Sequence, residues 1–140
     1  MHYWDASALV PLCFDEGKTA RARSLARAQG IVTWFLSPVE VASAVERRFR
    51  EGALEAEGRS LALRTLGDLA ASWIEVTAAT RVRERALRVL ATHSLRAADA
   101  LQLAAALVAT EDRPNGSHFV CDDHRLRDAA TREGFQAVDL

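Results

Sequence analysis

The chain has few of the residues and segments that mark several common classes of protein. Only two of its 140 residues are cysteine, and they form no CxxC pair, so we expect two reduced thiols in a cytosolic core. The longest uncharged run near the middle, residues 100–110, is too short to span a bilayer. The amino terminus has neither a basic region nor an apolar signal core. We therefore expect a cytoplasmic protein with no membrane contact.

Sequence motifs of several enzyme classes are also missing. There is no GxGxxG or GxxxxGK[ST] phosphate loop and no GxSxG nucleophile elbow. Asp5 is not followed by a second aspartate two residues later, which argues against a phosphoaspartate hydrolase of the DxD kind. The histidines lack metal-ligand spacing such as HxxxH, and we interpret them as surface or incidental residues: His2, His93, His118 and His124.

Lysine is nearly absent, because 17 of the 18 basic residues are arginine and only Lys18 is lysine. The net charge of −1 does not by itself suggest a nucleic-acid-binding protein. If four of the 19 acids face a bound metal ion, however, 15 acids remain against 18 bases and the surface is mildly basic. Arginine suits phosphate because its planar guanidinium can donate two hydrogen bonds at once. An arginine-rich genome would explain the same count equally well.

The chain does contain a regular alternation of short apolar segments and helical patterns. With 49% hydrophobic residues it fits a single folded domain over residues 1–140. We expect strands at 2–5, 31–36, 73–77, 117–121 and 135–139, and helices at 6–29 (a pair), 38–50, 54–72, 80–92, 96–110 and 124–133. This order predicts an α/β fold, with a central, mainly parallel sheet of four to five strands and helices on both faces. In such sheets ligands bind at the carboxyl ends of the strands.

Acidic residues interrupt four apolar or small-residue segments, where a lone carboxylate is energetically costly. They are Asp5, Glu40, Asp99 and Asp123. Carboxylates that are brought together repel one another unless protons or a metal ion neutralise them. Hard cations prefer oxygen ligands, so we interpret these residues as a candidate Mg²⁺ or Mn²⁺ site.

Two of these acids have a structural explanation at a helix start. Asp5 precedes a helix and would cap its free N–H groups, although Ser7 could cap instead and leave Asp5 free for a ligand. The segment from Ser37 to Glu40 has the pattern of a capping box with Pro38 at the first helical position. In that interpretation Glu40 bonds to the backbone.

The other two acids leave different alternatives open. Asp99 lies in a helix that is apolar on nearly all sides, where a salt bridge to Arg96 or a first-turn dipole role competes with metal binding. Asp122 and Asp123 follow a strand and precede a helix, so one would cap the helix and the other would face the cluster. Position alone does not decide which.

Four segments, in this order and with suitable gaps, resemble the motifs of the PIN-domain family, and within it the VapC-type toxins of bacterial toxin–antitoxin pairs. They are Tyr3–Val10, Val39–Ala44, Leu95–Leu107 and Phe119–Leu126, and Phe14–Gly17 resembles the acidic turn that often follows the first. The resemblance covers essentially all of the chain and selects Asp123 as the fourth acid. Cys121 departs from the family pattern because serine or threonine is usual there, and Asp122 adds a carboxylate.

The resemblance implies a three-layer α/β/α PIN-like domain with metal-dependent endoribonuclease activity. Its catalytic residues would be Asp5, Glu40, Asp99 and Asp123, with Asp5 and Asp99 as ligands of Mg²⁺ or Mn²⁺. Candidate phosphate contacts are Arg47, Arg48, Arg96 and Arg125. The implied partners are RNA, a cognate antitoxin bound between the helices at 38–50 and 54–72, and a second copy in a homodimer. A non-toxin PIN nuclease of RNA processing and a catalytically silent PIN binding module are the alternatives.

Overall fold

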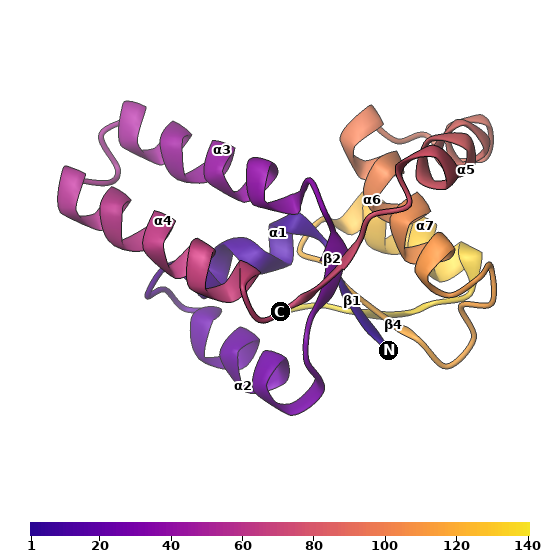
Figure 1. Ribbon diagram of the computed structural model, residues 1–140, viewed down its shortest axis with the longest axis horizontal. Helices are drawn as coiled ribbons and strands as arrows, with labels where there is room; N and C mark the ends of the chain where they lie inside the picture. The colour runs from indigo at the N-terminus through magenta and orange to yellow at the C-terminus, as the bar shows by residue number, and fades with distance from the viewer.

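Five short parallel strands form the centre of the molecule in a computed structural model that describes residues 1–140 (Figure 1). They are β1 (His2–Trp4), β2 (Val32–Trp34), β3 (Ile74–Val76), β4 (His118–Val120) and β5 (Gln136–Val138). Their order across the sheet is β3-β2-β1-β4-β5, and every neighbouring pair is parallel. All five predicted strands are confirmed, although each is shorter than the apolar segment that predicted it.

Helices connect each strand to the next and cover both faces of the sheet. They are α1 (Ala6–Leu9), the 3₁₀ helix η1 (Val10–Cys13), α2 (Thr19–Gln29), α3 (Ser37–Arg50), α4 (Ala56–Ala70), α5 (Ala79–Thr92), α6 (Ala97–Ala109) and α7 (His124–Glu133). Figure 1 shows α2, α3 and α4 on one side of the strands and α5, α6 and α7 on the other, which confirms the predicted three layers. None of the helices is long and apolar enough to cross a membrane.

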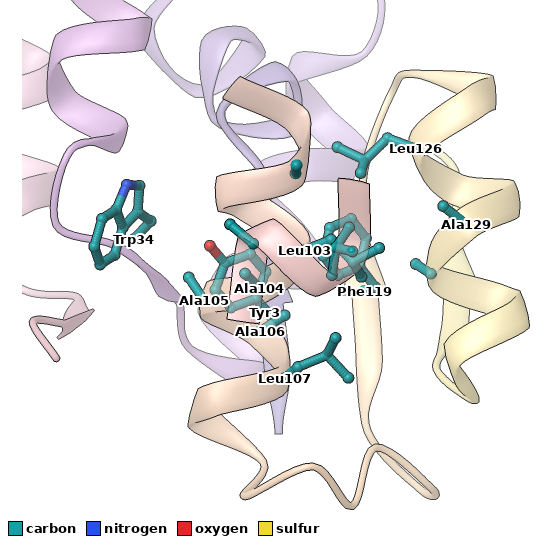
Figure 2. Close-up of a cluster of buried hydrophobic side chains, with 14 of the residues drawn as sticks. Tyr3, Trp34, Leu103, Ala104, Ala105, Ala106, Leu107, Phe119, Leu126 and Ala129 are labelled. Atoms are coloured by element: carbon teal, nitrogen blue, oxygen red, sulfur yellow. The ribbon is translucent and has the colours of Figure 1, made fainter. Parts of the chain in front are cut away.

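Alternation of side chains along the strands separates two apolar cores. Tyr3 pairs in register with Phe119 and Trp4 with Val120. Tyr3 and Phe119 pack with α5, α6 and α7, whereas Trp4 and Val120 pack with α1 to α4. Figure 2 shows the first of these cores, in which side chains of α6 lie beside Tyr3 and Phe119. Burying each such large side chain contributes about 1.5–3 kcal/mol to folding.

The most deeply buried helix is α6, as its apolar sequence predicted. Every residue from 102 to 108 is buried, and α6 packs against α5, α7 and the strands β2 and β3. Asp99 stands in the first turn of this helix. Asp5 and Cys121 directly follow strands β1 and β4, and the Cys121 thiol contacts the Asp5 carboxylate at this carboxyl edge of the sheet.

Candidate active site

Asp5 caps helix α1, as one of its two predicted roles required, and it is almost completely buried. Its Oδ2 accepts hydrogen bonds from Ser7 N at 2.9 Å and Ser7 Oγ at 2.5 Å, and Cys121 Sγ lies 3.5 Å from the same oxygen. Oδ1 has no hydrogen-bond partner in the protein. Burial raises the pKa of Asp5, the bonds from Ser7 and Cys121 oppose that rise, and the charge of Asp99 adds to it.

Glu40 does not form the predicted capping box, and that interpretation was wrong. Leu36 occupies the N-cap position of α3 without a side-chain bond, and Ser37 is already helical. The Glu40 carboxylate instead accepts a hydrogen bond from Gln102 Nε2 at 2.8 Å. Burial raises the pKa of Glu40 to about 7, with contributions from the charges of Asp5 and Asp99, whereas the Gln102 bond opposes the rise. The tertiary contact replaces the local cap because buried Gln102 needs a partner.

Asp99 has no salt bridge to Arg96, so the alternative of a structural ion pair is not supported. Burial raises the pKa of Asp99, and the charge of Asp123 raises it further. The charge and backbone of Arg96 oppose this rise without reversing it. Asp99 is only half-buried and lines an open pocket, so it is accessible to a ligand.

Asp122 and Asp123 make different contacts, and the expected division into one cap and one site residue is not found. Asp123 is the N-cap of α7 and accepts a hydrogen bond from Leu126 N at 2.9 Å. It also lines the same pocket as Asp99, so one residue serves as the cap and faces the acids. Asp122 points elsewhere and forms an ion pair with Lys18.

Cys121 contributes a buried thiol where the family usually has a hydroxyl. Its sulfur accepts a hydrogen bond from Asp123 N at 3.3 Å and lies 3.6 Å from Ser7 Oγ. Burial, followed by the charge of Asp5, raises the pKa of the thiol. The residue is therefore a neutral link between the loop that carries Asp123 and the loop that carries Asp5.

The four acids share one edge of the sheet but do not meet in one pocket. Asp99 and Asp123 line a pocket of about 770 Å³, whereas Glu40 lines a second pocket together with Ser7. Asp5 lines neither pocket, but it bonds to Ser7 of the second pocket, and electrostatic repulsion couples it to Asp99 and to Glu40. The expectation that all four acids lie together in one site is therefore not confirmed.

The carboxylates have the chemistry of a divalent-cation site but not a closed geometry. No three of the histidine, cysteine, aspartate and glutamate side chains lie together closely enough to hold a metal ion. Nevertheless, the charge of Asp99 raises the pKa of Asp5 and Glu40, the charge of Asp5 also raises that of Glu40, and no lysine or arginine side chain bonds to any of the three. These carboxylate oxygens repel one another, and no cationic side chain neutralises them. Such oxygens suit Mg²⁺, which keeps several waters and needs few protein oxygens. The residues therefore fit a hydrated ion.

The four arginines predicted to contact phosphate flank these acids. Arg96 and Arg125 line the pocket of Asp99 and Asp123, and neither forms an ion pair. Arg47 and Arg48 line the pocket of Glu40, but Arg48 is already engaged with Glu16 at 3.2 Å and with the ring of Phe14. Arg47, Arg96 and Arg125 are thus available to a polyanion on both sides of Asp5.

Sequence reasoning missed one residue of the site. Gln102 is fully buried in α6 and bonds to Glu40, yet it was not singled out. The available signal was a single amide in an otherwise apolar, buried helix, because such a group needs hydrogen-bond partners.

Comparison with protein families identifies one match that spans most of the chain. The family model described as "PIN domain" matches residues 3–131. No curated protein matches the chain. PIN domains are in general nucleases and commonly use divalent metal ions, in agreement with the acids and arginines at the carboxyl edge of the sheet. With this fold and this match, the chain belongs to the PIN-domain family.

Proposed function

We propose that the protein is a Mg²⁺- or Mn²⁺-dependent endoribonuclease. The observation that carries this proposal is the pocket in which Asp99 and Asp123 stand beside Arg96 and Arg125. Carboxylates suit a hard cation, and unpaired guanidinium groups suit the phosphates of a nucleic acid. The similarity of the acidic motifs to those of VapC-type toxins favours RNA as the substrate.

Each residue has a role that follows from its surroundings. Asp5 and Asp99, with water, would hold the cation, which when bound polarises a phosphate oxygen and lowers the pKa of water. Glu40, whose pKa of about 7 is near neutrality, orients a water molecule and accepts its proton. The water oxygen bonds to phosphorus in line with the leaving sugar oxygen, which departs and takes a proton from solvent. Arg96 and Arg125 bind the flanking phosphates.

An RNA cleavage assay tests this proposal. Labelled single-stranded RNA should be cleaved by the wild-type protein in Mg²⁺ or Mn²⁺ and left intact in EDTA. Asp99→Asn should abolish cleavage, whereas Asp68→Asn, which changes an exposed acid of α4, should not. Cleavage that persists in EDTA, or in Asp99→Asn, would refute the assigned chemistry.

We further propose that the nuclease is a cytoplasmic toxin whose partner is a cognate antitoxin. Supporting observations are the exposed apolar side chains of Val39, Phe49 and Leu61 on α3 and α4. An adjacent pocket is lined by Phe14 and Leu54. A helix of the antitoxin would pack its apolar face there, and a basic residue, most simply arginine, would enter the acidic site and compete with the metal ion.

Metal titration of the complex tests the antitoxin proposal. The product of an adjacent short gene should co-purify with this protein, and Mn²⁺ should bind the free protein more tightly than the complex. Equal Mn²⁺ affinity in both would show that the antitoxin does not act by occupying the acidic site. Sedimentation of the free protein should give the mass of a homodimer, since a two-fold dimer is the commonest soluble assembly.

A further inference from the structure

One polar side chain inside α6, that of Gln102, makes three hydrogen bonds to residues distant in sequence. Gln102 Oε1 accepts from the Tyr3 hydroxyl at 2.7 Å. Its Nε2 donates to Ser37 Oγ at 3.0 Å and to Glu40 Oε1 at 2.8 Å. Both Tyr3 and Gln102 are fully buried. A buried amide whose partners are all present is held in one orientation.

The identity of those partners determines which way the amide faces. The carbonyl oxygen of Gln102 can only accept, so it faces the hydroxyl hydrogen of Tyr3. Both hydrogens of the amide nitrogen are then directed to Ser37 and Glu40. Reversing the amide would place two acceptors against each other at Glu40.

The neighbouring hydroxyl groups support the same assignment. Thr33 Oγ1 donates to the Trp4 carbonyl at 2.7 Å, so its single hydrogen is used there. Ser37 Oγ, which lies 2.7 Å from Thr33 Oγ1, must therefore donate to Thr33. Ser37 is left to accept from Gln102. The direction of every hydrogen bond in this buried network is thus determined.

We propose that Gln102, oriented by Tyr3, is a positioning residue that decides which oxygen of Glu40 takes part in catalysis. Glu40 Oε1 accepts the hydrogen bond from Gln102, whereas Glu40 Oε2 has no hydrogen-bond partner in the protein. Oε2 is therefore the oxygen presented to the reacting water. This inference rests on the proposed function of Glu40. Restricting a carboxylate to one orientation saves entropy when the reacting groups must align.

Gln102 separates Tyr3 from Glu40, so a substitution at Tyr3 tests the network without altering Glu40 itself. It lies in the apolar core beside Ala104 and Ala105 (Figure 2). Its ring stacks on Phe119 with the centroids 5.3 Å apart. Tyr3→Phe removes only the hydroxyl that orients Gln102 and keeps the packing.

Kinetics of RNA cleavage test the inference. Tyr3→Phe and Gln102→Leu should lower kcat by about 10- to 100-fold with KM unchanged, a magnitude like that for losing an outer hydrogen-bond partner at a metal site. Neither change should lower the residual rate of Glu40→Gln further, because both act through Glu40. If either substitution lowered kcat as much in the Glu40→Gln background as in the wild-type protein, the proposal would be overturned. Thr19→Val, which removes a buried hydroxyl bonded to Pro11, is the matched control and should keep kcat.

Nuclear magnetic resonance of the free protein gives a readout that needs no activity. The side-chain amide signals of Gln102, assigned by their absence in Gln102→Leu, should shift in both Tyr3→Phe and Glu40→Gln but not in Thr19→Val. Signals unchanged in both variants would overturn the network even if RNA is cleaved. Shifted signals in a wild-type protein that cleaves no RNA would retain the network and reject the proposed function.

Discussion

At the residue scale, the carboxyl groups of Asp5, Glu40 and Asp99 share one property: burial raises the pKa of each, and the charge of at least one neighbouring acid raises it further. Such groups are destabilising in their charged form when no cation is bound. Asp99→Asn should therefore keep or raise the melting temperature in metal-free buffer while abolishing RNA cleavage. Thermal unfolding followed by circular dichroism measures this. A marked loss of thermal stability would instead indicate a stabilising partner such as Arg96.

The raised pKa of Glu40 also predicts how stability depends on pH. Between its ordinary pKa of 4.5 and about 7, the folded protein binds more protons at Glu40 than the unfolded chain does. The free energy of unfolding of the metal-free protein should therefore fall as pH rises through this window, by about 1–3 kcal/mol from Glu40. Urea denaturation at several pH values measures the slope. Glu40→Gln should flatten the slope, and an unchanged slope would assign it to other groups.

At the scale of the elements, helix α7 ends at Gly134, where only glycine fits well. Gly134 has φ of +104°, and an added Cβ would lie 3.1 Å from Asn115 Oδ1 and 3.2 Å from Pro114 Cγ. Gly134→Ala should lower the free energy of unfolding by about 1–3 kcal/mol. Gly67→Ala, inside α4 with nothing within 4 Å of the added Cβ, is the matched control. It should raise the free energy of unfolding by about 0.5–1 kcal/mol. If chemical denaturation showed the same change in the free energy of unfolding for both substitutions, the explanation given for Gly134 would be wrong.

The elements were predictable because their signals are local. Apolar runs such as Phe119–Val120 predict strands, and the apolar pattern of α6 predicts burial, so both were placed correctly. The capping box at Ser37 failed because its hydroxyl bonds to Thr33, four residues earlier, and to Gln102, and because Glu40 also bonds to Gln102. Only the folded chain brings Gln102 to them, so that part of the site could not be derived from spacing.

At the scale of the whole molecule, the arginines on both sides of the acids predict a salt-dependent interaction with RNA. RNA affinity, measured by fluorescence anisotropy without metal, should fall as salt increases. Arg96→Gln and Arg125→Gln should each reduce the slope of log K against log salt by about 0.7, the value for one phosphate contact on a single strand. Arg64→Gln, on an exposed face of α4, should leave the slope unchanged. If all three substitutions reduced the slope equally, the effect would come from the overall charge of the protein and not from contacts at the site.

We propose that Asp5 and Asp99 hold a divalent cation at the carboxyl edge of the sheet. Anomalous X-ray scattering from crystals soaked in Mn²⁺ tests it most directly. We expect an anomalous peak beside Asp5 Oδ1 and Asp99, with bridging water, in the wild-type protein, and no such peak in Asp99→Asn. A wild-type crystal saturated with Mn²⁺ that shows no peak at these carboxylates would contradict the claim.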